Sequence, residues 1–401
     1  MLKGKTVLLG VSGSIAAYKA AQLTSLLKKQ EADVHVLMTK NGTEFITPLT
    51  FETLTGNKCH VDTFDRNFKF DVEHIELAKK ADLIIVAPAT ANVIGKFAYG
   101  IADDMLTTTV LASKAPKIIA PTMNTNMYEN PITQENINKL ESLGIKVIEP
   151  ASGLLACKDI GKGKMPEPEL LLEYIMMEIA REKDLLGKRV LITAGATMEA
   201  IDPVRYITNH STGKMGIAIA KECAYRGANV TLVAASVSEE IPKLINTIRV
   251  RSAEEMYDEV DRIVDSVDFV FKAAAVADYT PKEVYQGKVK KKDEDLSIPL
   301  KRTKDILKEM GYRKNEKQVF CGFSMETENL ILNSSKKLES KNADIIVANC
   351  LRDKGAGFGT DTNLVTFITK EGREALELMH KQQVAAALVD KCIEIAKDKN
   401  Y

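Results

Sequence analysis

Short runs of apolar, mostly β-branched residues alternate with helix-like segments along the whole chain. In the N-terminal half these runs occupy residues 7–11, 34–38, 83–87, 118–120 and 147–148. Each run is short enough to be a buried strand, and most intervening segments are long enough to be helices. This alternation predicts a parallel sheet covered by helices.

The same pattern restarts in the second half. A helical stretch at 170–180 leads into the charged residues 181–184 and Gly187, which we interpret as a linker. Apolar runs then occupy 190–193, 230–234, 269–275, 319–323, 345–348 and 365–368, and an amphipathic helix is expected over 375–397. We therefore predict two doubly wound, Rossmann-like α/β domains over residues 1–183 and 187–401. Ligands of such sheets bind at the carboxyl ends of the strands.

Composition narrows the class of protein. The 401 residues are 45% hydrophobic, enough for two buried cores of roughly 200 residues each. The 55 basic and 55 acidic residues cancel, which disfavours a general nucleic-acid or anionic-membrane partner. No apolar run approaches the roughly 20 residues that span a bilayer, and no basic and apolar leader precedes the first strand. We expect a soluble, cytoplasmic protein whose six cysteines, without a CxxC pair, are thiols.

The first strand leads through Gly13, Ser14 and Ile15 into a helix. The sequence is not the GxGxxG dinucleotide pattern. It can be a plain strand-to-helix turn, or it can hold a mononucleotide phosphate on the helix N-terminus with help from the Ser14 hydroxyl. After a later strand, the small Ala89 leaves space for a flat ring whose edge Thr90 and Asn92 can contact.

Three further residues of this half carry possible chemistry. His74 has a side chain whose unperturbed pKa, about 6.5, suits proton transfer, although a single His is often structural. Asn124 follows a strand end, where its carboxamide can hold a carboxylate or simply belong to a loop. Cys157 lies in a glycine-punctuated loop in which Lys158, Lys162 and Lys164 can lower its pKa below about 8.5.

Together and in this order, these segments resemble the flavin-dependent cysteine decarboxylases over nearly all of residues 1–180, with a flavodoxin-like flavoprotein domain. The resemblance implies that His74 is the active-site base, Asn124 a clamp for the substrate carboxylate and Cys157 the proton donor. It further implies an FMN site formed by Gly13, Ser14, Ile15, Thr39, Ala89, Thr90 and Asn92. The family oxidises a cysteine thiol to a thioaldehyde, which accepts the electrons of decarboxylation. Lys158 and Lys164 stand where the family usually has Gly and Arg. These two differences concern the efficiency of the reductive half of the reaction.

The second half contains the same succession of a strand, a glycine-bearing turn and a helix, which suits phosphate binding. Asn209 lies in this segment, between a strand and a helix expected near residue 214. Read by itself, this is also compatible with a dinucleotide-binding dehydrogenase. Asp278 ends a strand after Ala275, where it can contact a ribose, a base or a Mg²⁺-bound phosphate. Lys288 opens a basic run that is otherwise typical of a solvated surface.

With segments 322–327 and 341–349, these features resemble phosphopantothenate–cysteine ligase over residues 187 to about 370. The resemblance implies that Asn209 contacts the acyl intermediate and that Lys288 is a flexible-loop lysine reaching the phosphates. The nucleotide site it implies comprises Ala273, Ala274, Ala275, Asp278, Lys288, Lys304, Asp305, Ile306, Leu307, Phe323, Lys337 and Lys341. It also implies Mg²⁺ or Mn²⁺, but the sequence does not identify metal ligands.

The two resemblances combine into a bifunctional enzyme of coenzyme A biosynthesis. The ligase would join 4'-phosphopantothenate to L-cysteine with CTP through an acyl-cytidylate, and the FMN domain would decarboxylate the product to 4'-phosphopantetheine. Fused bacterial and archaeal forms use CTP, whereas separate eukaryotic ligases prefer ATP. The sequence does not decide which of the two nucleotides this chain uses. The alternatives are a flavoprotein domain acting on another cysteine-containing substrate, or a regulatory subunit without turnover. The family also implies a homo-oligomer, in which trimers and dimers build a closed dodecamer.

Overall fold

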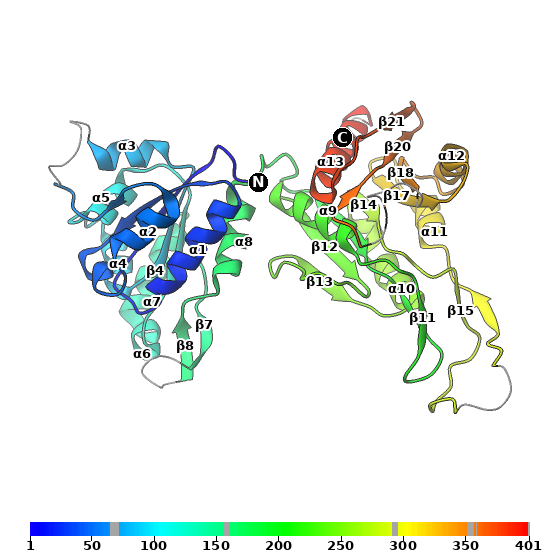
Figure 1. The fold of residues 1–401 in the computed structure, drawn as a ribbon, viewed down its shortest axis with the longest axis horizontal. Coiled ribbons are helices and arrows are strands. Elements are labelled where there is room, and N and C mark those ends of the chain that lie inside the picture. The colour runs from blue at the N-terminus through cyan, green and yellow to red at the C-terminus, as the bar shows by residue number, and fades with distance from the viewer. Residues whose placement is uncertain (65–71, 155–159, 291–295, 351–356, 358, 400–401) are drawn as a thin grey trace. The chain divides into compact units, whose positions relative to one another are not determined.

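The computed structural model describes residues 1–64, 72–154, 160–290, 296–350, 357 and 359–399. The chain folds as two compact units, Met1–Arg181 and Glu182–Tyr401. Both units are built on a parallel sheet covered by helices, so the predicted pair of doubly wound α/β folds is confirmed (Figure 1).

The first unit contains a six-stranded parallel sheet in the order β3-β2-β1-β4-β5-β6. Its strands are β1 (Thr6–Val11), β2 (Asp33–Met38), β3 (Cys59–His60), β4 (Leu83–Ala89), β5 (Lys117–Pro121) and β6 (Lys146–Val147). Every residue of β1 and β4 is buried, as expected of central strands covered on both faces. Without the two-residue edge strand β3, the order is the flavodoxin-like 2-1-3-4-5, whose direction reverses between β1 and β4.

Helices cover both faces of this sheet. They are α1 (Ala17–Lys29), α2 (Pro48–Thr55), α3 (Glu73–Lys80), α4 (Ala91–Tyr99), α5 (Met105–Ala112), α6 (Thr125–Glu129), α7 (Pro131–Ser142) and α8 (Pro168–Ile179), with the short 3-10 helix η1 (Lys40–Glu44) after β2. Helix α1 packs against α2 and α8, and α4 packs against α5 and α7. A separate antiparallel hairpin joins β7 (Ala151–Leu154) to β8 (Ile160–Lys164).

The second unit contains an eight-stranded sheet in the order β13-β12-β9-β14-β17-β18-β20-β21. Its strands are β9 (Arg189–Ala194), β12 (Asn229–Ala234), β13 (Asn246–Arg249), β14 (Phe269–Lys272), β17 (Val319–Glu326), β18 (Ile345–Cys350), β20 (Thr366–Thr369) and β21 (Arg373–Ala375). The first six in this order run parallel, and β20 and β21 add an antiparallel edge. Here the strand order reverses between β9 and β14.

The remaining elements of the second unit surround that sheet. Its helices are α9 (Lys214–Tyr225), α10 (Ala253–Ile263), η2 (Val264–Ser266), α11 (Ile306–Arg313), α12 (Leu330–Ser340) and α13 (Lys381–Asp398). Three two-stranded sheets pair β10 (Met198–Ala200) with β11 (Tyr206–Thr208), β15 (Tyr279–Pro281) with β16 (Leu300–Arg302), and β19 (Thr362–Asn363) with β22 (Met379–His380).

Two predicted boundaries differ from the structure. The strand expected over 269–275 ends at Lys272, because the following residues leave the ladder and bond to the loop after β9. The final helix begins at Lys381 rather than residue 375, because 373–375 pair with β20 as β21. A capping box between His380 and Gln383 then fixes the helix start.

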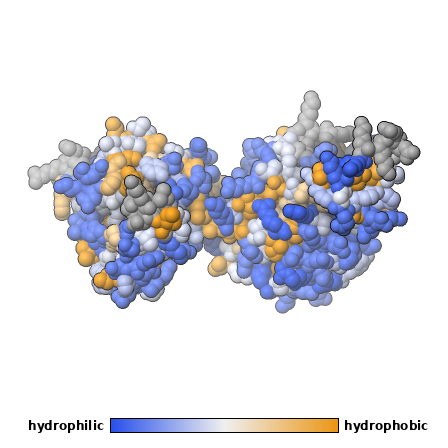
Figure 2. Space-filling model, turned by 90° about the horizontal axis from the view of Figure 1, so that it is seen from below, coloured by the Kyte–Doolittle hydropathy of each residue, from blue (hydrophilic) through white to orange (hydrophobic). Residues whose placement is uncertain are grey.

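The surface combines hydrophilic residues with local hydrophobic patches, as Figure 2 shows for one face. In the first unit, Ile15, Phe45 and Leu49 are large apolar side chains that are at least half exposed. Over the described ranges, none of the helices has the length and apolar character required to cross a membrane.

Candidate active sites

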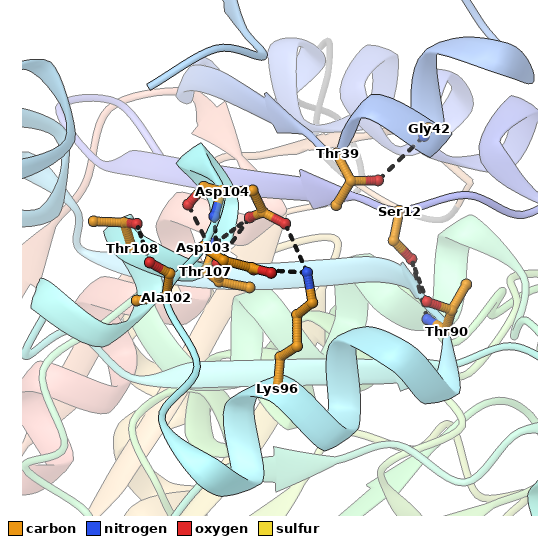
Figure 3. A network of polar contacts seen from close by, with 10 residues as sticks. All are labelled: Ser12, Thr39, Gly42, Thr90, Lys96, Ala102, Asp103, Asp104, Thr107 and Thr108. Carbon is orange, nitrogen blue, oxygen red and sulfur yellow. Dashed lines mark hydrogen bonds and ion pairs between the residues drawn. The ribbon is translucent and has the colours of Figure 1, made fainter. Parts of the chain in front are cut away.

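The first site lies where the strand order reverses between β1 and β4. Ser12, buried directly after β1, donates a 2.8 Å hydrogen bond from Oγ to the Pro88 carbonyl and accepts one of 3.1 Å from the Thr90 backbone N–H. Figure 3 shows Ser12 and Thr90 pointing toward one another. Thr39 also joins this edge, since its N–H donates to the Val11 carbonyl at 3.0 Å. Three predicted cofactor segments thus meet at the carboxyl ends of β1, β2 and β4.

The turn between β1 and α1 requires its glycine for space. A Cβ on Gly13 would lie 2.7 Å from the Cβ of Asn41, which follows β2. Ser14 Oγ accepts a hydrogen bond of 3.3 Å from the Ala16 N–H, and this contact shapes the turn that enters α1. Helix α1 begins without a cap from the side chain of Ala16, so the positive end of its dipole faces the turn.

The other predicted cofactor residues border the same edge. Ala89 is buried at the end of β4, whereas Asn92 is exposed on the first turn of α4 and Ile15 is 63% exposed beside the Gly13 turn. The exposed amide on α4 and the exposed apolar side chain beside the Gly13 turn can contact the polar edge and the face of a planar ligand.

Sequence reasoning missed a charged cluster next to this site. Lys96 on α4 donates to Asp103 at 2.7 Å and to Asp104 at 3.4 Å, and Asp104 also caps α5 through Thr107 (Figure 3). The hydrogen bond with Asp103, helped by the charge of Asp104, raises the pKa of Lys96. The sequence signal was the Asp-Asp pair before the apolar helix at 105–112, which is a typical N-cap pattern.

The predicted proton-handling residues are not all brought together within one chain. His74 is half-buried on α3, while Asn124 caps α6 by accepting a 2.9 Å hydrogen bond from the Asn126 N–H. Figure 1 draws α3 and α6 at opposite ends of the first unit. Asn124 instead neighbours β8, because Met123 N–H donates to Gly163 O at 3.1 Å. Cys157 and Lys158 lie outside the described residues, between β7 and β8.

The second site lies between β9 and β14. Asn209 donates a 3.2 Å hydrogen bond from Nδ2 to the carbonyl of Ala275, the third of the alanines that follow β14. The hydroxyls of Thr193 and Thr197 accept hydrogen bonds from the N–H groups of Ala274 and Ala277. This network ties the loop after β14 to the end of β9, and the Asn209 hydrogen bond joins its exposed carboxamide to that loop.

A pocket of about 490 Å³ opens beside this loop. Nine of the twelve predicted nucleotide residues line it: Ala274, Asp278, Lys304, Asp305, Ile306, Leu307, Phe323, Lys337 and Lys341. Lys341 forms an ion pair with Asp305, and Lys337 donates to Glu326 at 2.7 Å. Burial is the largest single influence on the Glu326 carboxyl and raises its pKa. The hydrogen bond and charge of Lys337, together with hydrogen bonds from Ser324 and Asn333, outweigh burial, so the pKa is lowered.

Ala273, Ala275 and Lys288 do not line this pocket. Lys288 is exposed, and its loop is held by Asp202, whose carboxylate accepts from the Val289 N–H at 3.1 Å. Hydrogen bonds from Arg205 also hold the Asp202 pKa far below its ordinary value. Asp202 and Arg205 line a second, larger pocket of about 810 Å³, which sequence reasoning did not anticipate.

No protein cage for a metal ion is evident in the described part of the chain. Among those residues, no group of three or more His, Cys, Asp or Glu side chains is arranged to hold one. The five described cysteines are free thiols, as predicted.

The chain is similar in sequence to known proteins. It is 48% identical over 401 residues, 99% of this chain and 98% of the relative, to the coenzyme A biosynthesis bifunctional protein CoaBC of Bacillus subtilis (strain 168). The chain belongs to the CoaBC family. The corresponding protein of Haemophilus influenzae (strain ATCC 51907 / DSM 11121 / KW20 / Rd) is 44% identical over 394 residues, with 98% of both chains covered.

Each half of the chain matches a different family model. Residues 1–180 match the Flavoprotein family, and residues 185–395 match the DNA/pantothenate metabolism flavoprotein C-terminal domain. A crystal structure of the C-terminal domain of a CoaBC protein is 42% identical and covers 54% of this chain and 100% of its own, with a TM-score of 0.47. The prediction of a bifunctional coenzyme A biosynthesis enzyme with a decarboxylase and a ligase activity is confirmed by the CoaBC relatives.

Proposed function

We propose that the second unit ligates 4'-phosphopantothenate to L-cysteine with CTP, and that the first unit decarboxylates the product with FMN to give 4'-phosphopantetheine. The observation that carries the ligase assignment is the convergence of nine predicted nucleotide residues on one pocket. That pocket lies at the carboxyl ends of parallel strands, where open α/β sheets bind ligands.

The ligase reaction requires activation of a carboxylate, because a carboxylate does not react with an amine at neutral pH. Attack on the α-phosphate of CTP forms an acyl-cytidylate and releases pyrophosphate, and the cysteine amine then displaces CMP. Lys304, Lys337 and Lys341 line the pocket and would stabilise the negative charge of the triphosphate. Mg²⁺ or Mn²⁺ would arrive bound to that triphosphate, which agrees with the lack of a three-ligand cage among the described side chains.

Asn209 is proposed to contact the acyl intermediate. The hydrogen bond from its Nδ2 to the Ala275 carbonyl favours one orientation of the exposed amide before substrate arrives. Lys288, exposed on a loop anchored at Val289, can extend toward the phosphates without a preformed pocket.

The residues at the first site fit FMN. The uncapped N-terminus of α1 and Ser14 suit its phosphate, the Thr39 hydroxyl lies at the adjacent strand end, and Thr90 and Asn92 suit the polar edge of its ring. When bound, the cofactor would supply the two-electron oxidation and reduction that decarboxylation of a cysteine amide needs. The chain itself would clamp the substrate carboxylate through Asn124 and supply a proton from the Cys157 thiol.

His74, proposed as the base, lies on α3, and Asn124 caps α6, which Figure 1 draws at the other end of the first unit. A site that uses both residues would therefore combine two copies of the chain. The exposed Ile15 and Phe45 beside the cofactor edge support such an assembly, since apolar surface of this kind is typical of subunit contacts. We propose a homo-oligomer, with a dodecamer as its closed form.

A coupled assay tests both halves. Full-length protein is supplied with 4'-phosphopantothenate, cysteine, Mg²⁺ and either CTP or ATP, while pyrophosphate and CO₂ are measured. We expect pyrophosphate release with CTP, followed by CO₂. Asn209→Asp should lose pyrophosphate-coupled ligation but keep CO₂ release from added 4'-phosphopantothenoylcysteine, whereas Cys157→Ser should ligate normally and stall at an oxidised, decarboxylated species.

Normal turnover in both variants would reject these residue roles. Bound flavin without CO₂ from 4'-phosphopantothenoylcysteine would instead favour another cysteine-containing substrate for the first unit. Absence of both products from the wild type would favour the regulatory alternative.

A further inference from the structure

Lys272 is a buried lysine at the second site that the assigned roles do not use. It is the last residue of β14 and is paired in register with Thr193 of β9 and Gly322 of β17. Its side chain is only 7% exposed, and its Nζ has no hydrogen-bond partner within the described ranges. A buried amine without a partner is costly, so its presence requires an explanation.

The side chain lines the 490 Å³ pocket. The other lysines of that pocket already have partners. Lys341 is paired with Asp305, Lys337 with Glu326, and the Lys304 Nζ lies 3.8 Å from the centroid of the Tyr257 ring. Lys272 is thus a buried donor left available to a bound molecule.

Its surroundings indicate which part of a nucleotide it would meet. Lys272 shares the deeper wall with the buried Ile306 and Ile346 and the half-buried Phe323, whereas Lys304 and Asp278 are exposed. Phosphates suit the exposed cationic side, and a flat base suits the apolar wall. With this orientation of a nucleotide, the amine would meet the base rather than the triphosphate. Burial also lowers the Lys272 pKa to about 7, and with or without its extra proton the amine keeps N–H donors.

We propose that Lys272 reads the nucleobase by donating a hydrogen bond from Nζ to the carbonyl oxygen of a pyrimidine, and thereby favours CTP over ATP. Cytosine presents such an oxygen, and adenine has none. In the ATP complex the buried amine would lose that acceptor, so discrimination would come partly from the unsatisfied donor. This inference rests on the proposed ligase function of the second unit.

The test compares Lys272→Met with Lys308→Met in the full-length protein. Methionine has a similar length and no donor, and Lys308 is an exposed lysine of α11 that does not line the pocket. Pyrophosphate release gives KM for CTP and ATP. We expect Lys272→Met to raise KM for CTP by about tenfold to a hundredfold, with a much smaller change for ATP, and Lys308→Met to resemble wild type.

A substrate change tests the same contact without a variant. In 2-thio-CTP, sulfur replaces the base oxygen and accepts hydrogen bonds more weakly. Wild type should show a raised KM for 2-thio-CTP relative to CTP, and this difference should vanish in Lys272→Met.

An unchanged KM for CTP in Lys272→Met, an equal rise for CTP and ATP, or equal use of CTP and 2-thio-CTP by wild type would overturn the inference. In those cases wild type still releases pyrophosphate, so the ligase proposal survives. Absence of pyrophosphate from wild type with any nucleoside triphosphate would reject the ligase proposal and this inference together.

Discussion

At the residue scale, a few polar side chains hold both sites in shape. Ser12 links the ends of β1 and β4, and Asn209 links its loop to the segment after β14. Neither position stands out by hydrophobicity, but each lies at the point where its sheet reverses strand order. Such hydrogen bonds fix loops that would otherwise sample many conformations.

Replacing Ser12 by alanine tests the first of these links. Ser12→Ala leaves the Thr90 N–H without its acceptor, at a cost of about 1–3 kcal/mol. Pro88 O loses the hydroxyl donor but keeps the backbone N–H of residue 12, at 3.2 Å. We expect a lower unfolding midpoint and at least tenfold weaker FMN binding, measured by denaturant titration and by flavin fluorescence. Ser142→Ala, which removes an exposed hydroxyl bonded to Lys139 O, is the control. Equal behaviour of the two variants would contradict the structural role of Ser12.

The buried amine of Lys272 should make the free energy of unfolding depend on pH. Burial lowers its folded pKa to about 7 from an unfolded value near 10.5, opposed only by the charge of Asp305. The unfolded chain then binds more protons between these values, so the stability of the wild type rises from pH 7 toward pH 10. Lys272→Met lacks this proton linkage. Its free energy of unfolding should exceed that of wild type most clearly near pH 7, and the advantage should shrink by pH 9.5.

Denaturant unfolding of both proteins at pH 7 and 9.5 measures the effect. A difference between wild type and Lys272→Met that stays constant over this range would show that the amine titrates at its ordinary pKa.

At the scale of elements, the strand-to-helix connections decide where ligands can bind. Gly195 follows β9 with φ at +84°, and a Cβ there would lie 2.3 Å from the Ser236 carbonyl oxygen. Gly213, the residue before α9, also has a positive φ, at +77°. The second site is therefore built on backbone that other residues adopt only with strain.

Gly195→Ala should destabilise the second unit more than Gly187→Ala. Both positions have positive φ, and both substitutions carry a conformational cost of about 1–2 kcal/mol. Only Gly195 adds a backbone clash, since nothing lies within 4 Å of a Cβ on Gly187. Thermal unfolding should show a clearly larger loss for Gly195→Ala, together with loss of pyrophosphate release. Similar melting of the two variants would mean that the Ser236 loop moves freely.

At the scale of the whole molecule, two compact units in one chain correspond to two family models. Under the proposed function, the product of the second unit is the substrate of the first. If that intermediate diffuses freely, chains defective in different units should complement one another.

Mixing full-length Cys157→Ser with full-length Asn209→Asp tests whether the intermediate passes from one chain to another. We expect the mixture to form 4'-phosphopantetheine from 4'-phosphopantothenate, cysteine and CTP, although each variant alone does not. Mass spectrometry of the products provides the measurement, and a mixture of two preparations of Asn209→Asp is the control. No product from the mixture, with each single step intact, would indicate that the intermediate does not exchange between chains.

The amino-acid sequence by itself determined the class of fold and most of the strands. Runs such as 7–11 and 190–193 form buried strands of the parallel sheets, and their continuous apolar character predicts this without a structure. The start of the last helix was predicted wrongly, because residues 373–375 gain their strand partners only from β20, a tertiary contact.

The tertiary structure alone decided which distant residues share a site. Lys272 belonged to an apolar run and gave no sign of function, yet the pairing of β14 with β9 and β17 puts it in the pocket with Phe323. His74 and Asn124 belong to one predicted reaction, but His74 lies on α3 and Asn124 directly precedes α6. Local patterns report the burial of a segment, because burial acts on each residue separately. Shared sites depend on strand order and helix packing, which bring together residues far apart along the chain.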